Sequence, residues 1–465
     1  MKDKQYIRLC PPWAFRGWYG RPGAIMAESG PNKYRPPFFY DREAFEVLLK
    51  CDGAHIINSG ELSEKVIKII EDLFDLGILA GSDNPQEPLE PFQNYKTFES
   101  RFIEVVEWAI TGKCNLKCRH CLVNSPDYHR QDLSPDQCLK IIDQLHDCGV
   151  RRIELTGGEP FMRRDWPDIV KWLSEKDVII TDVFTNGLLV NDKVLDIFTE
   201  CGQRPRFQIS YDGYGHHDWL RQVKGAQEGA ERAIELLKSR GFYVSASMCL
   251  NRRNKDSLRD TVRRLSSLGV QKFSVTLPLA LGEWQNAGDE ALTFEEEWDI
   301  YKEYIPEFFN DNMPVDIELG GYFTCSAGSR DYSIPFERKA LSEPALEKCR
   351  YCVEGTTRIF ISPEGRVYPC MGFSETALKD KMPSLLEESL ADITKDSSYR
   401  EMVNTTLKDL REACKDCADC EHFPVCRGGC MLNGMTAGGN FLVPDPSACY
   451  FYKNVGVSRV RKLLG

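Results

Sequence analysis

The sequence predicts an α/β protein in which a parallel sheet forms a partial (β/α)6 barrel, with a winged-helix-like module before it and a cysteine-rich region after it. Three observations lead to this prediction. Between residues 100 and 280, apolar β-rich segments alternate six times with helical segments. A short helical pattern and a linker precede them, and ten of the nineteen cysteines follow residue 324. We therefore divide the chain into residues 1–95, 96–324 and 325–465.

The N-terminal module is expected to be small and helical. In "LSEKVIKIIEDLFDLG" apolar residues recur at helical spacing, and Gly77 stands where this helix should end. The preceding "AFEVLLKC" is typical of a shorter helix closed by a "DG" turn. Residues 81–94 are rich in proline, asparagine and glycine, so they are predicted to be a linker.

The barrel strands run from "FIEVVEWAI", residues 102–110, to "VQKFSVTL", residues 270–277. The first helix has the clearest boundaries, with Ser134 as N-cap, Gln137 completing a capping box and Gly149 at the stop. Six strands are fewer than the eight of a closed barrel, so an open or partial barrel is expected. In either architecture the active site lies at the carboxyl ends of the strands.

Composition and charge narrow the class of protein. Apolar content of 42% and charged content of 28% are ordinary for a soluble globular protein. The N-terminal "MKDKQYIRLCPPWAF" lacks the apolar core of a signal peptide and no apolar run is long enough to span a membrane, so we expect a cytoplasmic protein. A net charge of −11 argues against nucleic acid as a partner. In a reducing compartment, clustered cysteines are predicted to bind metal rather than to form disulfides.

The stretch "CNLKCRHC", residues 114–121, follows the first strand and holds three cysteines as C-x3-C-x2-C. A 4Fe-4S cluster has four irons, each of which takes one ligand beyond its sulfides. Three thiolates leave one iron open, as catalytic metal sites do. Zinc is the alternative, but the loop lacks the paired C-x2-C spacing of zinc fingers. The pattern therefore favours a catalytic cluster on Cys114, Cys118 and Cys121.

The segment "ELTGGEP" ends the second strand, with Gly157 and Gly158 allowing close backbone approach and Glu159 offering a carboxylate to an amine. "CNLKCRHC" followed by "TGGEP" resembles the radical S-adenosylmethionine (SAM) enzymes over about residues 100–280. The resemblance implies that the open iron binds SAM, and that reduction yields a 5′-deoxyadenosyl radical that abstracts a substrate hydrogen. Such chemistry needs no general acid or base, and we assign none.

The same resemblance implies SAM contacts at the strand ends. His120 would lie by the adenine, while Ser210 is preferred to Asp212, which is equally a turn residue before Gly213. "TLPLALGE" stands where many relatives carry an arginine after the sixth strand. His216 and His217 are expected to be solvated loop residues, and Cys249 to be structural. The implied SAM-binding set is His120, Gly157, Gly158, Glu159, Asn186, Ser210 and Asp212.

The C-terminal region carries a second cysteine pattern. "CVEGTTRIFISPEGRVYPC" is C-x12-G-x4-C, and "CADCEHFPVCRGGC" is C-x2-C-x5-C-x3-C. Such a segment buries little apolar surface alone, so we expect its metals to hold it together. The pattern resembles the SPASM extension of radical SAM enzymes, which implies two auxiliary 4Fe-4S clusters and three clusters in all. The implied ligands are Cys352, Cys370 and Cys430 for the first, and Cys417, Cys420, Cys426 and Cys449 for the second.

The eighth auxiliary ligand stays open. Cys349 forms C-x2-C with Cys352 and is our choice. Cys325, Cys414 and a substrate thiolate are the alternatives. Zinc held by four thiolates is the alternative for the whole region.

"FEVLLKCDGAHIINSGELSEKVIKIIEDLFDLGIL" resembles the PqqD-like recognition element of enzymes that modify ribosomally made peptides. Such elements bind a leader peptide as an added strand. The combination implies a radical SAM/SPASM maturase that takes hydrogen from a precursor peptide and installs a crosslink, with a Cys thioether (sactipeptide or ranthipeptide type) preferred. A flavodoxin or ferredoxin-type protein would be the reductant. Carbon–carbon crosslinking, epimerisation, anaerobic sulfatase (formylglycine) maturation and simple electron transfer are the alternatives.

Overall fold

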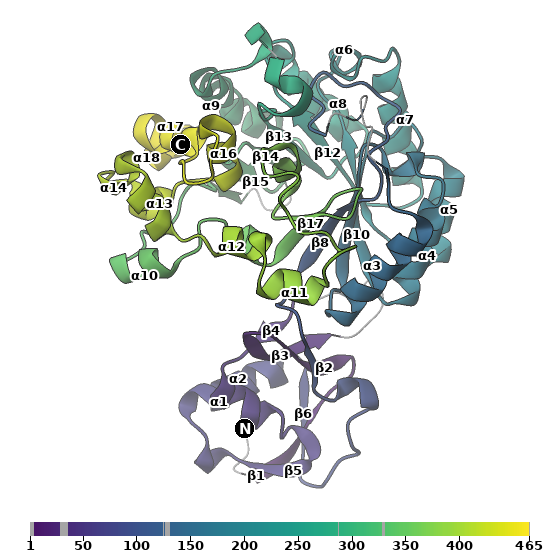
Figure 1. Cartoon of the computed structure of the whole chain (residues 1–465), viewed down its shortest axis with the longest axis vertical. Helices are drawn as coiled ribbons and strands as arrows, with labels where there is room; N and C mark the ends of the chain where they lie inside the picture. Colours follow the sequence, from purple (N-terminus) through teal and green to yellow (C-terminus); the bar gives the residue numbers. More distant parts are fainter. Residues whose placement is uncertain are drawn as a thin grey trace.

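The computed structural model describes residues 4–27, 36–123, 125, 131–286, 288–327 and 331–464. The N-terminal module lies at one end of the molecule, and the barrel and the C-terminal region form the larger body (Figure 1). The module has its own hydrophobic core, which includes Ile7, Leu48 and Ile70, whereas a single core runs through the barrel and the C-terminal region. In the part of the chain described here, no helix is both long and apolar enough to cross a membrane.

The N-terminal module contains more strand than the sequence predicted. Its two expected helices are present, but "WAFRGWYGRPGAIMA" forms a hairpin whose turn needs Gly20 at φ +76°. Two antiparallel-rich sheets result, in the orders β5-β1-β6 and β4-β3-β2-β7. The strands of this hairpin are short and buried on both faces, so their sequence lacks the alternation of apolar and polar residues that indicates a strand. The elements are β1 Lys4–Leu9, β2 Trp13–Trp18, β3 Arg21–Ala27, β4 Phe38–Phe39, α1 Arg42–Leu48, β5 Asp52–Asn58, α2 Glu64–Asp75, β6 Leu79–Ser82 and β7 Lys96–Phe98.

The partial barrel is confirmed, and the six predicted strands are parallel neighbours in chain order. Helices cover the outer face of the sheet (Figure 1). The six strands and their helices are β8 Val105–Ala109, α3 Pro135–Asp147, β9 Arg152–Thr156, α4 Trp166–Glu175, β10 Ile179–Thr185, α5 Asp192–Glu200, β11 Arg206–Ser210, α6 His217–Arg221, α7 Ala226–Ser239, β12 Val244–Cys249, α8 Leu258–Ser267 and β13 Lys272–Thr276.

Two further parallel strands extend the sheet beyond those six. After α9 (Phe294–Asp311), β14 (Asp316–Leu319) pairs with β13, and β17 (Arg358–Ile361) pairs with β8 at the other edge. Antiparallel strands complete the two edges. These are β15 Phe323–Cys325 and β16 Tyr332–Ser333 at one edge and β18 Val367–Tyr368 at the other.

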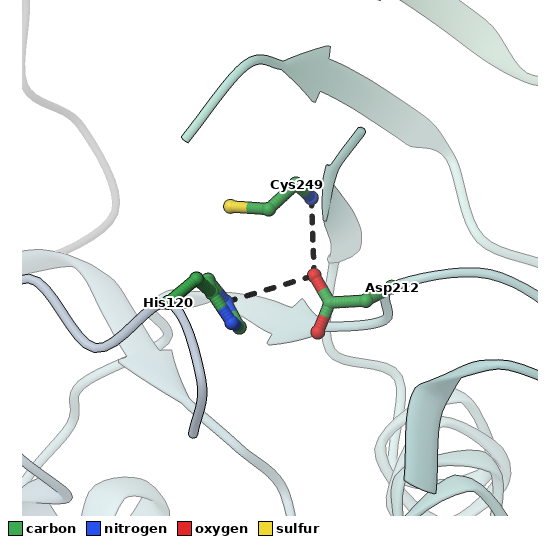
Figure 2. Close-up of side chains that lie close together, drawn as sticks. All are labelled: His120, Asp212 and Cys249. Carbon is green, nitrogen blue, oxygen red and sulfur yellow. Dashed lines mark hydrogen bonds and ion pairs between the residues drawn. The ribbon is translucent and has the colours of Figure 1, made fainter. Parts of the chain in front are cut away.

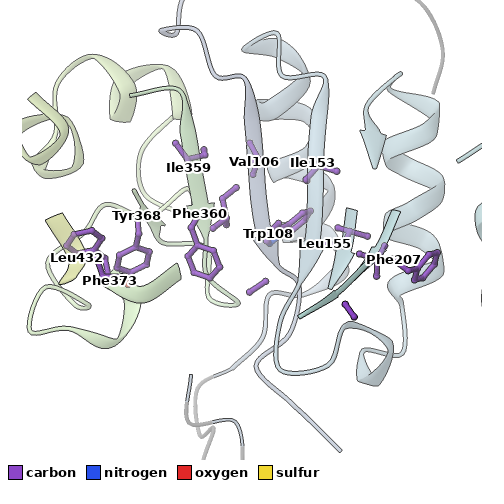
Figure 3. Packing of buried hydrophobic residues seen from close by; sticks show 14 of the residues in the cluster. Val106, Trp108, Ile153, Leu155, Phe207, Ile359, Phe360, Tyr368, Phe373 and Leu432 are labelled. Carbon is purple, nitrogen blue, oxygen red and sulfur yellow. The ribbon is translucent and has the colours of Figure 1, made fainter. Parts of the chain in front are cut away.

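The C-terminal region packs onto the barrel rather than standing apart. Phe360, Tyr368 and Phe373 continue the buried layer that contains Val106 and Trp108 of the first strand (Figure 3). This shared core adds apolar packing against the barrel to the metals that we expected to hold the region together. Its helices are α10 Glu343–Lys348, α11 Leu390–Lys395, α12 Ser398–Asn404, α13 Leu407–Ala413, α14 Lys415–Ala418, α15 Phe423–Cys426, α16 Met431–Gly438, α17 Pro446–Tyr450 and α18 Gly456–Lys462.

Phe360→Ala tests this shared core. The ring is 1% exposed, so its loss should cost about 3–5 kcal/mol of stability and lower the thermal unfolding midpoint. Val353→Ala is the matched control, because that side chain is 59% exposed. Equal midpoints for the two variants, measured anaerobically, would show that the interface contributes little.

Candidate active site

A cavity of about 370 Å³ opens at the carboxyl ends of the barrel strands, where the sequence placed the active site. The cysteine loop forms one wall, and Thr156, Ser210 and Ser247 at the ends of three strands form another. Leu277, Pro278 and Leu279 line it where the expected arginine is missing. Of the predicted site residues, the cavity is lined by Cys114, Cys118, His120, Cys121, Gly157, Gly158, Asn186, Ser210 and Asp212.

Each thiol of the cysteine loop accepts a hydrogen bond. The backbone N–H of Leu116 donates to Cys114 Sγ at 3.4 Å, and that of Ser125 donates to Cys121 Sγ at 3.3 Å. Such donors stabilise thiolate ligands. Burial raises the pKa of Cys114 to about 12, so the thiolate form at neutral pH needs a positive centre beside it. Three converging thiols of this kind fit an iron–sulfur cluster.

The glycine pair brings the second strand against the cysteine loop. Gly158 N–H donates to Thr111 O at 2.9 Å, and Glu159 N–H donates to Lys113 O at 2.8 Å. A Cβ on Gly158 would lie 2.4 Å from Lys113 O, and one on Gly157, at φ +155°, would lie 2.4 Å from Thr111 O. The close approach inferred from the sequence is therefore made to the backbone that leads into the loop.

Gly158→Ala should disturb this contact severely. The clash is with backbone oxygen, which cannot turn away, so we expect a loss of at least about 3 kcal/mol, the upper end of typical overpacking costs. Iron content after reconstitution should fall with the stability. Gly60→Ala is the control, because the nearest atom to its Cβ is 3.5 Å away. Wild-type unfolding and iron content in Gly158→Ala would contradict this assignment.

Glu159 is not among the residues that line the cavity, and its contact with an amine stays a prediction. Its carboxylate is fully buried and accepts hydrogen bonds from Thr185 Oγ1 at 2.8 Å and Asn186 N–H at 2.9 Å. Burial raises the pKa of Glu159 to about 7, against these donors. The side chain points inward, where the polar turn after the third barrel strand provides its hydrogen-bond donors. In this structure it positions Asn186.

Asn186 connects that turn to the cysteine loop. Its Nδ2 donates to Asn115 Oδ1 at 2.8 Å and lies 4.0 Å from Cys114 Sγ. Its side chain therefore reaches the edge of the cysteine loop. Ser210, at the end of β11, lines the same cavity from the next strand.

Asp212 is the centre of a buried polar group and not only a turn residue. Figure 2 shows it between His120 and Cys249: its Oδ1 accepts from Cys249 N–H at 3.0 Å and lies 3.8 Å from His120 Nε2. Its Oδ2 accepts from Arg221 Nε at 2.6 Å. We assign no metal to His120, Asp212 and Cys249, although their donor atoms lie within 4.8 Å, because the guanidinium already neutralises the carboxylate.

His120 retains an unused donor or acceptor. Among the residues that the structure places, its Nδ1 is buried and has no hydrogen-bond partner. Burial lowers the pKa of His120 to about 4, so the ring is neutral at pH 7. A buried, unpartnered ring nitrogen in the wall of the cavity fits a polar ligand such as the SAM adenosine.

Sequence reasoning missed two residues that line the cavity, Arg221 and Cys249, and also the buried His217 that contacts Asp212. His217 is 1% exposed and accepts from Asp212 N–H at 2.9 Å, which corrects the expected solvated loop; His216 is half-buried. Cys249, expected to be structural, lines the cavity, as does Arg221. His217 and Arg221 are four residues apart in "HDWLR", which puts them on one face of a helix. This spacing is the pattern from which the pair could have been predicted.

The C-terminal cysteines form two groups. Burial, and then the nearness of Cys430 and Cys352, raises the pKa of Cys370 to about 12, so these three lie together. Burial, and then Cys449 and Cys420, raises the pKa of Cys426 to about 12, which marks the second group. The SPASM resemblance implied the same neighbours, and the assignment of these cysteines to two clusters stays a prediction.

Cys414, one of the open choices for the eighth ligand, lies with the second group. Burial, and then Cys414 and Cys449, raises the pKa of Cys417. Cys325 lies on β15, at the opposite edge of the sheet from β18, which precedes Cys370. Cys349 ends α10, and its thiol lies 3.7 Å from the Arg350 carbonyl oxygen.

Comparisons with known proteins agree with this architecture. The profile of the radical SAM superfamily matches residues 108–265, and that of the SPASM iron–sulfur cluster-binding domain matches residues 344–421. The chain is 26% identical over 355 residues to the AdoMet-dependent heme synthase of Oleidesulfovibrio alaskensis, covering 74% of this chain and 87% of that protein. It is also 26% identical over 333 residues to the subtilosin biosynthesis protein AlbA of Bacillus subtilis, covering 70% and 67%.

A solved structure shares the fold over nearly the whole chain. Streptococcus suis SuiB bound to its precursor peptide SuiA has a TM-score of 0.66 at 14% identity, covering 95% of this chain and 99% of that one. A likeness of that extent includes most of the N-terminal module. The chain thus carries a radical SAM domain followed by a SPASM domain, and it is a radical SAM enzyme that binds SAM and iron–sulfur clusters.

Proposed function

We propose that the protein is a cytoplasmic peptide maturase that installs a crosslink, preferably a Cys thioether, in a ribosomally made precursor peptide. The observation that carries this proposal is the N-terminal module, which has its own core and stands at one end of the barrel (Figure 1). The shared fold with SuiB, a protein solved with a precursor peptide, includes this module and supports the proposal.

The proposed leader site is a groove of about 500 Å³ between β4 and α2, lined by Phe38, Tyr40, Ile69 and Leu76. Within the described ranges β4 pairs only with β3, so its other edge is open to an added strand. The same groove offers apolar side chains for every second residue of that strand. Asp72 at its rim favours a leader with a basic residue beside the apolar ones.

We propose that Cys114, Cys118 and Cys121 hold the catalytic cluster and that Asn186, Ser210 and the Gly157–Gly158 turn contact SAM. When bound, the cluster and SAM supply a carbon radical that abstracts hydrogen. The chain's own residues shape a cavity that excludes water on its apolar side, at Leu277 and Leu279. Two auxiliary clusters are proposed at the C-terminal groups, with Cys349 as the fourth ligand of the first.

Thioether formation from a C–H and an S–H removes two electrons and two protons. One hydrogen atom leaves with the adenosyl group, and the thiol proton goes to solvent. One electron remains and needs an acceptor near the substrate. Cys370 follows β18, directly beyond the strand that pairs with β8, so an auxiliary cluster there would lie against the barrel. A flavodoxin or ferredoxin-type protein is the proposed source of the reducing electron.

The match to heme synthase favours a second candidate, an iron porphyrin substrate. One experiment separates the two. The full chain, reconstituted anaerobically, is given SAM, a reductant and either a panel of short cysteine-bearing peptides with leader segments or an iron porphyrin. We expect the peptide to increase the formation of 5′-deoxyadenosine. The modified peptide should be lighter by two hydrogens and should have one thiol fewer that can be alkylated.

The other outcomes identify the alternatives. A peptide mass lower by two hydrogens with every thiol intact indicates a carbon–carbon bond. A peptide mass that is unchanged in ordinary water but gains deuterium in heavy water indicates epimerisation. Conversion of a cysteine or serine of a sulfatase peptide to an aldehyde indicates formylglycine chemistry. Product from the porphyrin and none from any peptide would overturn the proposal.

A further inference from the structure

Arg221 connects the cysteine loop to the buried wall of the cavity. It ends α6, is 9% exposed, and its Nη1 donates to Cys118 Sγ at 3.5 Å. Its Nε donates to Asp212 Oδ2 at 2.6 Å. One guanidinium therefore bridges a proposed cluster ligand and a carboxylate, and nothing in the substrate proposal requires this arrangement.

The cysteine loop and α6 are fixed to each other on both sides of this contact. Arg119 N–H donates to Leu220 O at 2.9 Å, one residue before Arg221. Just after it, the Gln222 side chain donates to Lys117 O, on the other side of Cys118. These contacts hold the backbone of Arg221 beside that of Cys118.

Asp212 is equally constrained. It is 1% exposed, and its carboxylate accepts from Cys249 N–H while its own N–H donates to His217 Nδ1. Burial alone would raise the pKa of Asp212, but Arg221, His120 and His217 together hold it well below its usual range. The carboxylate is therefore ionised at neutral pH, and the Arg221–Asp212 ion pair persists there.

A positive charge and an N–H donor at a cluster sulfur favour the state with one more electron. The electron adds negative charge to the iron and its thiolates, so a guanidinium at 3.5 Å stabilises the reduced form more than the oxidised form. The effect is large in a buried site because water does not screen it. Asp212 acts with the opposite sign from the far side of the same guanidinium.

We propose that Arg221 and Asp212 together set the reduction potential of the catalytic cluster. Arg221 raises the potential through the Cys118 sulfur, and Asp212 limits that rise and fixes the guanidinium in place. Arg221 is thus a positioning residue that acts through a cluster ligand. The proposal concerns the radical SAM domain itself, so it holds whatever the substrate is.

The test is a potentiometric titration of the full chain, reconstituted with iron and sulfide and followed by electron paramagnetic resonance. The catalytic cluster is identified as the signal that changes when SAM is added. Arg221→Gln should shift its midpoint to a more negative potential, and Asp212→Asn should shift it to a more positive one. Arg221→Lys, which keeps the charge, should shift it less than Arg221→Gln.

Opposite signs distinguish this role from a structural one. Arg263→Gln is the control, because Arg263 pairs with Asp311 on the surface and should leave the potential unchanged. Unchanged midpoints, or shifts of the same sign in both variants at full iron content, would overturn the proposal. If Arg221→Gln does not retain iron, the midpoint potential of Asp212→Asn is the test. A more positive midpoint than in the wild type supports the proposal, and any other result refutes it.

Discussion

Cys118→Ala is expected to abolish reductive SAM cleavage. Cys118 is the buried member of the cysteine loop, and its thiol accepts a hydrogen bond from Arg221 Nη1. Loss of an outer partner of a metal site typically costs about 10–100-fold, and loss of a ligand of an open-site cluster should cost more. We therefore expect 5′-deoxyadenosine formation to fall by more than about 100-fold, to the assay background. The iron content should fall by about four irons per chain, which is one cluster.

Two measurements make this result specific. Cys201→Ala, a half-buried cysteine at the end of α5 outside the cavity, should keep both iron and activity. The auxiliary clusters should survive in Cys118→Ala, so part of the iron–sulfur absorbance should remain. Unimpaired SAM cleavage in Cys118→Ala would remove the basis for the catalytic cluster.

Leu76→Asp is expected to weaken peptide modification while leaving the radical chemistry intact. Leu76 is 52% exposed at the end of α2, so the free protein should fold normally, but it lines the proposed leader groove. A leader residue that buries against Leu76 gains about 1.5–3 kcal/mol, and the introduced carboxylate removes that gain. The KM for the precursor peptide should rise about 10–100-fold with kcat nearly unchanged.

The matched control is Ile56→Asp. Ile56 is as exposed as Leu76, at 55%, but lies on β5 in the other small sheet. SAM cleavage without peptide should be the same in both variants and in the wild type. A KM that rises equally in Ile56→Asp, or in neither variant, would place leader binding elsewhere.

The barrel could be predicted because local and global signals agree there. The capping box at Ser134 and Gln137 and the stop at Gly149 are both present. Strand β17 could not be predicted as a barrel strand, because its partner β8 lies some 250 positions earlier and no local pattern reports such a pairing. The C-terminal region consequently looked more independent than it is.

The sequence predicts those parts of the candidate site that lie in motifs of fixed spacing. It does not predict the parts that only the fold brings together. The three cysteines lie within eight residues after the first barrel strand, and the two glycines are adjacent after the second. Asp212 contacts Arg221 on α6 and Cys249 at the end of β12, and periodicity does not show contacts between separate elements. The hydrogen bonds of the Glu159 carboxylate could not be predicted for a related reason, because only the fold brings Thr185 and Asn186 beside it.

The pairing of β17 with β8 has a consequence for biosynthesis. When the first barrel strand leaves the ribosome, the strand that covers its outer edge has yet to be translated, so the nascent chain carries an exposed, apolar sheet edge for most of its synthesis. Chains that stop before residue 358 retain that edge permanently and are prone to aggregate. Full-length translation is therefore a condition for a closed edge beside the catalytic loop, and premature termination yields insoluble material rather than a partly competent catalyst.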